Sequence, residues 1–149
     1  MPVTLQDVVN ELDREEPDYT QAARLGAEAL PFLRELIQGN NLAIASKAAF
    51  LAGQINGEGS LQVLEVAAQH PNPVVRVAAA ASAKNVAGLS STLANTFLND
   101  TDPGVRKWGL RTIEVAAPQG IRPSVEKMMT DDPEPALRDL ARKVIDRIK

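Results

Sequence analysis

The sequence predicts an all-α protein, a short right-handed α-α superhelix of about four helix pairs with a capping helix at each end. Three observations support this prediction. One pattern recurs five times, in which usually a turn residue is followed by an apolar residue two positions later and a small residue four positions after that. Apolar residues between these copies follow helical spacing. Only 3% of the 149 residues are aromatic and alanine is frequent, which favours close helix packing over a β-sheet.

The spacing of the pattern defines the expected helix pairs. Its small residues lie 25, 31, 30 and 32 residues apart, at Ala23, Ala48, Ala79, Gly109 and Ala141. Each copy begins the first helix of a pair, and the apolar segment that follows forms the second. We expect a single domain over 1–149, with an N-terminal helix at 1–16, helix pairs at 17–41, 42–72, 73–102 and 103–134, and a terminal helix at 135–149.

Local signals place the individual helices. Thr4 and Asp7 resemble a capping box at the start of the N-terminal helix, which we expect over 4–15. Prolines suit a first helical turn, where their missing N–H has no intrahelical partner, and they occur in this role at Pro17, Pro31, Pro73, Pro103, Pro123 and Pro135. The first helices are expected at 17–26, 42–55, 74–86 and 103–116, and three of the second helices at 30–38, 60–69 and 89–98.

Two of the turns carry a more specific motif. Asn72-Pro73-Val74-Val75-Arg76 precedes Ala79, and Asp102-Pro103-Gly104-Val105-Arg106 precedes Gly109. Both resemble the Asp-Pro-x-Val-Arg-x-x-Ala signature of HEAT-like repeats, the class also described as phycocyanobilin-lyase-type HEAT repeats. A third, slightly altered copy surrounds Arg138, whereas Thr20 and Ala45 occupy the arginine position in the two earlier copies. The resemblance covers the chain from Pro17 to the C-terminus and specifies the fold better than the activity.

The resemblance also suggests a role for the repeated arginines. It implies that Arg76, Arg106 and Arg138 bond to aspartates or carbonyls in neighbouring turns. We favour this structural role over a ladder that captures an anionic partner, because a repeated arginine at a repeat junction needs no ligand to explain it.

Composition excludes several kinds of chemistry. The chain has no cysteine and one histidine, His70, so disulfides, thiolate zinc sites, cysteine nucleophiles and histidine-rich metal cages are excluded. HEAT-type hydroxylases need repeated His-Glu pairs as iron ligands, and the sequence has none. No catalytic constellation stands out. We therefore expect a protein that is not an enzyme and that uses no cofactor or metal.

The net charge of the chain and its N-terminal sequence indicate which partners and which cellular location to expect. A formal net charge of -3 and a pI near 5.2 argue against nucleic acid, which demands a basic face. The sequence shows no signal peptide and no apolar run of roughly 18 residues, so we expect a cytoplasmic protein without membrane contact. The acidic first 18 residues and the basic stretch 136–149 are interpreted as solvated capping faces rather than a head-to-tail contact, so a monomer is expected.

The leading functional hypothesis is a non-catalytic scaffold or adaptor that binds another protein or a peptide on the concave face of the solenoid. Polar residues of the second helices and the single tryptophan are the candidate contacts: Arg34, Gln38, Gln62, Glu65, Gln69, Asn95, Asn99, Glu126, Lys127 and Trp108. For Trp108, packing beside Gly109 is the alternative. The resemblance implies a second hypothesis, a bilin lyase-like subunit or accessory factor, because a tetrapyrrole needs mainly an apolar cleft with a few polar groups. A nucleic-acid-binding repeat module is the third.

Overall fold

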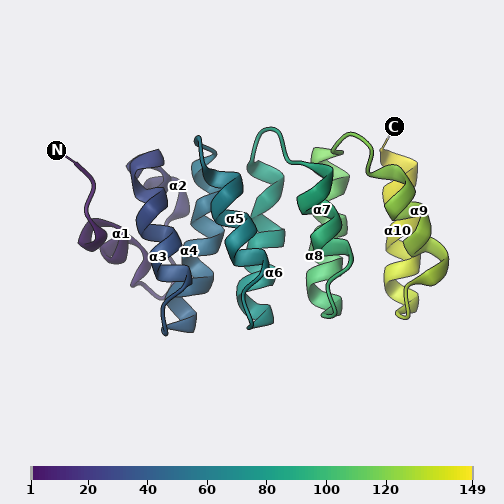
Figure 1. The fold of residues 1–149 in the computed structure, drawn as a ribbon, viewed down its shortest axis with the longest axis horizontal. Coiled ribbons are helices and arrows are strands. Elements are labelled where there is room, and N and C mark those ends of the chain that lie inside the picture. The colour runs from purple at the N-terminus through teal and green to yellow at the C-terminus, as the bar shows by residue number, and fades with distance from the viewer. Residues whose placement is uncertain (1, 149) are drawn as a thin grey trace. The chain divides into compact units, whose positions relative to one another are not determined.

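The computed structural model describes residues 2–148, and within them every regular element is helical (Figure 1). The all-α prediction is therefore confirmed. The chain divides into two compact units, Met1–Ala87 and Gly88–Lys149. The expected single domain stays a prediction, and the helix ends expected at residues 1 and 149 lie outside the described residues. No helix in the described part of the chain is long and apolar enough to cross a membrane.

The first unit is organised around one long helix, α4 (Leu42–Ile55), which packs against α3, α5 and α6. The other elements of this unit are α1 (Leu5–Leu12), α2 (Tyr19–Ala22), the 3-10 turns η1 (Ala23–Leu25) and η2 (Ala27–Ala29), α3 (Leu30–Ile37), α5 (Ser60–Ala68), α6 (Pro73–Ser82) and the 3-10 turn η3 (Ala83–Asn85). Apolar residues of α1, α3, α4, α5 and α6 form its buried core. The unit thus contains first helices (α2, α4, α6) that alternate along the chain with second helices (α3, α5).

The second unit has the same alternation with four helices. They are α7 (Ser91–Leu98), α8 (Pro103–Ala116), α9 (Arg122–Asp131) and α10 (Pro135–Arg147). Helix α8 packs against α7 and α10, and α9 packs against α10. Leu110, Ile113, Val125, Leu137 and Val144 belong to one hydrophobic cluster that joins these helices.

Several helix starts lie where the capping residues and prolines predict them, whereas the one expected at Pro17 does not. Thr4 Oγ1 accepts the Asp7 backbone N–H at 3.1 Å, and the Thr4 N–H donates to Asp7 Oδ2 at 3.0 Å, so the capping box is present. Pro73, Pro103 and Pro135 each begin a helix as predicted. Pro17 does not, and that prediction is wrong. Helix α2 begins at Tyr19 because the side chain of Asp18 caps it by accepting the Gln21 N–H.

The repeat pattern serves packing, as the sequence indicates. Its apolar position is buried at Ile44, Val75, Val105 and Leu137, and its small position is buried at Ala48, Ala79, Gly109 and Ala141. A Cβ placed on Gly109 would lie 2.8 Å from the Cβ of Phe97, so α8 approaches α7 too closely for any larger residue without a shift.

The three repeated arginines share one hydrogen-bond arrangement. Each donates from Nη1 to the carbonyl six residues before it, and two of them also donate to the carbonyl five residues before. The bonds run from Arg76 to His70 (2.9 Å) and Pro71 (3.1 Å), from Arg106 to Asp100 (3.0 Å) and Thr101 (3.2 Å), and from Arg138 to Asp132 (2.7 Å). Each arginine thereby ties its helix to the turn that precedes it, and the expected structural role is confirmed.

Arg106 makes an additional contact with the side chain of Asp132. Its Nε and Nη2 donate to the two carboxylate oxygens at 2.9 and 3.2 Å, which is a bidentate pair. Both side chains are buried, with 11% and 3% of their surface exposed. Asp132 Oδ1 also accepts the Glu134 N–H at 2.9 Å, so this one carboxylate joins α8 to the turn between α9 and α10.

Tyr19 makes the stability of the first unit depend on pH in the alkaline range. Its ring packs against Phe50, with centroids 4.7 Å apart, and burial raises the pKa of the Tyr19 hydroxyl above its ordinary value of 10.0. The folded state therefore favours the neutral phenol. The contribution of the buried Tyr19 hydroxyl to stability is present below pH 10.0. It is lost as the pH rises through the pKa of this hydroxyl in the folded state, because Tyr19 ionises at lower pH in the unfolded chain.

We therefore expect Tyr19→Phe to lose less stability between neutral and alkaline pH than the natural chain. Chemical unfolding at several pH values measures this difference. Tyr19 is the only tyrosine, so phenolate absorbance in the folded protein follows it alone. An absorbance midpoint at or below 10.0 would contradict the raised pKa.

Candidate functional site

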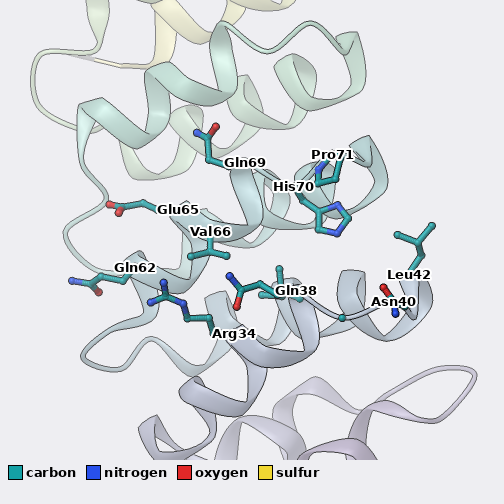
Figure 2. A pocket seen from close by; sticks show the side chains of 12 residues that line it. Arg34, Gln38, Asn40, Leu42, Gln62, Glu65, Val66, Gln69, His70 and Pro71 are labelled. Atoms are coloured by element: carbon teal, nitrogen blue, oxygen red, sulfur yellow. The ribbon is translucent and has the colours of Figure 1, made fainter.

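A cleft lies in the first unit, between α3 and α5 (Figure 2). It has a volume of about 900 Å³. We call it the first-unit cleft, and its lining residues are Arg34, Ile37, Gln38, Gly39, Asn40, Leu42, Gln62, Glu65, Val66, Gln69, His70 and Pro71. They come from the two second helices and from the turns that follow them.

Helical periodicity positions the polar residues of this cleft. Helix α3 buries Leu33 and Ile37 in the core, so Arg34 and Gln38, one turn apart, are left on its exposed side. Helix α5 buries Val63, Leu64 and Ala67 in the same way. Gln62, Glu65 and Gln69 therefore form an exposed row along α5. The two rows make a polar rim on either side of the cleft.

The cleft also has apolar lining. Ile37, Leu42, Val66 and Pro71 contribute it, and Leu42 is 44% exposed. Figure 2 shows Val66 near the centre of the cleft. An apolar surface with a few polar groups around it is the usual composition of a site for a small organic molecule.

Charge is concentrated at one end of the cleft. Figure 2 shows Arg34 with Gln62 and Glu65 at the end opposite His70, Pro71 and Leu42. The guanidinium of Arg34 forms no hydrogen bond or ion pair with any residue between 2 and 148. It differs in this from Arg106, whose donors are occupied within the fold.

The turn at the other end is held in place by hydrogen bonds. His70 Nδ1 accepts the Asn72 backbone N–H at 2.9 Å, and the His70 carbonyl accepts Nη1 of Arg76. Nδ1 accepts a hydrogen bond in this geometry, which places the N–H of the imidazole on Nε2. These bonds fix the position of Pro71 at the cleft.

A smaller cleft of about 340 Å³ occupies the corresponding place in the second unit, between α7 and α9. Its lining residues are Asn95, Leu98, Asn99, Asp100, Arg106, Ser124, Lys127, Met128, Asp131, Asp132 and Pro133. Most of them lie 61 or 62 residues, two repeats, after a residue of the first-unit cleft. Asn95 corresponds to Arg34, and Lys127 corresponds to Glu65. The repeat thus places a cleft at the same register in both units. The charged residues on the rims of the two clefts differ.

The predicted contact residues fall into three groups. Arg34, Gln38, Gln62, Glu65 and Gln69 line the first-unit cleft. Asn95, Asn99 and Lys127 line the second-unit cleft. Glu126 and Trp108 line neither one: Glu126 pairs with Arg122 on the surface of α9 at 3.3 Å, and Trp108 is 37% exposed on α8.

Sequence reasoning missed the apolar part of the site. The expected helices at 42–55 and 60–69 contain Leu42 and Val66, but helical spacing gives no sign that these residues and Pro71 line a cleft. Leu42 occupies the place that proline holds in later copies of the repeat, and this departure was the available signal. Within residues 2–148 the structure shows no group of three or more histidine, cysteine, aspartate or glutamate side chains placed to hold a metal ion.

The alternating helix pairs and the arginine-capped turns define the fold as that of a HEAT-like helical-repeat protein. Among solved structures the chain is similar to one described as the complex of CpcE and CpcF of phycocyanin lyase from Nostoc sp. PCC7120, with 20% identity and a TM-score of 0.75. The match covers 94% of this chain and 96% of that one. No protein-family model matches the sequence, and no curated protein matches it significantly.

This comparison corrects the leading functional hypothesis. The structure that shares the fold belongs to a lyase, and it favours the bilin lyase-like alternative over a non-catalytic scaffold. The similar chain is part of an enzyme, so the lack of a recognisable catalytic constellation in the sequence does not make this chain a non-enzyme. The similar chain also belongs to an assembly of two different proteins.

Proposed function

We propose that this protein is a bilin lyase-like subunit or accessory factor that binds a bilin in the first-unit cleft and acts together with a second protein. The observation that carries the proposal is the likeness to the phycocyanin lyase complex, which extends over 94% of this chain and 96% of the matched one. The occurrence of that chain in a complex of two proteins supports a protein partner here.

The composition of the first-unit cleft suits a bilin. A bilin is an open-chain tetrapyrrole, with a flat conjugated body, pyrrole N–H groups, terminal carbonyls and two propionate side chains. The apolar surface of Val66, Leu42 and Pro71 can contact the conjugated body, and the amides of Gln38 and Gln69 can bond to its N–H and carbonyl groups. The volume of about 900 Å³ lies within the range of roughly 300 to 1,000 Å³ for small-molecule sites.

Binding in this cleft is expected to be reversible. A thioether bond to a bilin needs a cysteine thiol, and the chain has no cysteine. The protein would hold a bilin through packing and hydrogen bonds and release it intact. Reversible binding is what a protein needs if it presents a bilin to another protein rather than carrying it permanently.

An absorbance titration with biliverdin tests this proposal. We expect a saturable change in the visible spectrum, and complete extraction of the pigment when the protein is denatured. Val66→Trp fills the centre of the cleft and should weaken binding at least about tenfold, because the bilin and the indole compete for one apolar surface. Ser124→Trp is the matched control, since it places the same indole in the second-unit cleft.

The proposal fails if biliverdin causes no spectral change with the natural chain. It also fails if Val66→Trp, with an unchanged helical circular dichroism spectrum, binds as tightly as Ser124→Trp. In that case the bilin would be bound away from the first-unit cleft.

A further inference from the structure

We infer that Arg34 recognises a propionate carboxylate of the ligand and so determines the orientation in which the first-unit cleft binds it. This inference rests on the proposed function, because it assigns a role within the same cleft. It goes beyond that function by predicting that the ligand must carry a free carboxylate, and by naming the residue that detects it.

Arg34 has hydrogen-bond donors that the fold does not use. Its side chain is exposed on the cleft rim, and its guanidinium has no hydrogen-bond or ion-pair partner among residues 2–148. Arg76 and Arg106, by contrast, donate to carbonyls of their own turns. A guanidinium with free donors in a fork geometry can bind a carboxylate through two parallel hydrogen bonds.

The cationic group and the apolar surface are separated along the cleft. Arg34 lies at one end and Leu42 and Pro71 lie at the other (Figure 2). A ligand with an apolar body and a carboxylate satisfies both ends in one orientation only. The reverse orientation would place a carboxylate beside Leu42 and Pro71, away from the guanidinium of Arg34, which is unfavourable.

The corresponding cleft of the second unit lacks the guanidinium of Arg34. Asn95, which is neutral, occupies the position of Arg34, and Arg106 is paired with Asp132. Asp100 and Asp131 add acidic groups to that rim. Lys127 is a cation on this rim, but it stands at the position of Glu65 rather than that of Arg34, and the two carboxylates accompany it. The second-unit cleft therefore has the same register but no cation at the position of Arg34. Selectivity for the first unit follows from residues that vary between repeats, not from the repeat pattern itself.

Comparison of biliverdin with biliverdin dimethyl ester tests the role of Arg34, because the ester keeps the conjugated body and removes both carboxylate charges. We expect the natural chain to bind the free acid about five times more tightly than the ester, a modest factor because the rim is exposed to solvent. Arg34→Gln should lose about the same factor for the free acid and change its affinity for the ester less than twofold. Arg34→Lys keeps the charge and should retain part of the preference.

Glu65→Gln is the matched control. It makes a change of similar size on the same rim but removes a negative charge instead of a positive one. It should leave the affinity for the free acid unchanged or raise it, since it removes a charge that repels the carboxylates. General damage to the rim would weaken both variants alike and would contradict the inference.

The outcomes separate the two proposals. If the natural chain binds neither form, the proposed function and this inference both fail. If it binds the free acid and the ester equally, or if Arg34→Gln retains the preference for the free acid, the inference fails while the proposed function stands. Loss of the preference in Arg34→Gln alone supports both.

Discussion

Arg106→Ala is expected to lower the free energy of unfolding by about 3 to 5 kcal/mol, the largest effect of any arginine substitution considered for this chain. The variant leaves the Asp132 carboxylate buried without its cationic partner, since only 3% of that side chain is exposed. It also removes the donor for the Asp100 and Thr101 carbonyls. Trp108 is the only tryptophan and lies in the second unit, so its fluorescence during chemical unfolding measures this loss.

Arg142→Ala is the matched control for this prediction. Arg142 also pairs with an aspartate, Asp139, at 2.7 Å, but both side chains are more than half exposed. Its loss should cost less than about 1 kcal/mol. The double variant Arg106→Ala with Asp132→Ala should be less destabilised than the sum of the two single variants, because each single change leaves the other partner unpaired. An Arg106→Ala variant as stable as Arg142→Ala would overturn the account of a buried pair.

Gly53→Ala is expected to destabilise the first unit by about 2 kcal/mol, although alanine is normally the better helix former. A Cβ at this position would lie 2.5 Å from the Cβ, the Oγ and the backbone oxygen of Ser82. Ser82 is fully buried, and its hydroxyl donates to the carbonyls of Ala49 and Ala79. The clash therefore involves backbone and cannot be relieved by rotating a flexible side chain, so α4 and α6 must separate.

Gly39→Ala is the control for Gly53→Ala. A Cβ on Gly39 would meet its nearest atom at 3.4 Å, which is close to ordinary van der Waals contact. Its effect should stay within about 0.5 kcal/mol. Unfolding by denaturant, followed by circular dichroism, compares the two variants. Equal stability of Gly53→Ala and the natural chain would mean that α4 and α6 are not in the close contact described.

The proposed site shows how far a repeat pattern leads toward function. Residues of the repeat pattern, such as Val75, Ala79 and Arg76, are used in packing and in the turns. Arg34 and Leu42, on which the proposed ligand site depends, stand where other copies have different residues. A search for site residues in this fold therefore begins with the positions at which the repeats differ.

The sequence by itself determined the helices and their faces. Capping residues and prolines placed the starts of α4, α6, α8 and α10 within one residue, because these signals act within a single turn of the chain. Helical periodicity likewise predicted the polar rim from Arg34 to Gln69, since a residue exposed on one side of an amphipathic helix needs no knowledge of the rest of the fold.

Tertiary structure alone decided which of these faces meet. Three features bring together residues that are far apart in the sequence. Arg106 pairs with Asp132, and Gly53 lies against Ser82. The apolar surface of the cleft combines Leu42 with Val66 and Pro71, which lie 24 or more positions later. Such contacts depend on the angle and distance between packed helices, which many side chains determine together. For the same reason the sequence revealed the polar residues beside the cleft but not the cleft.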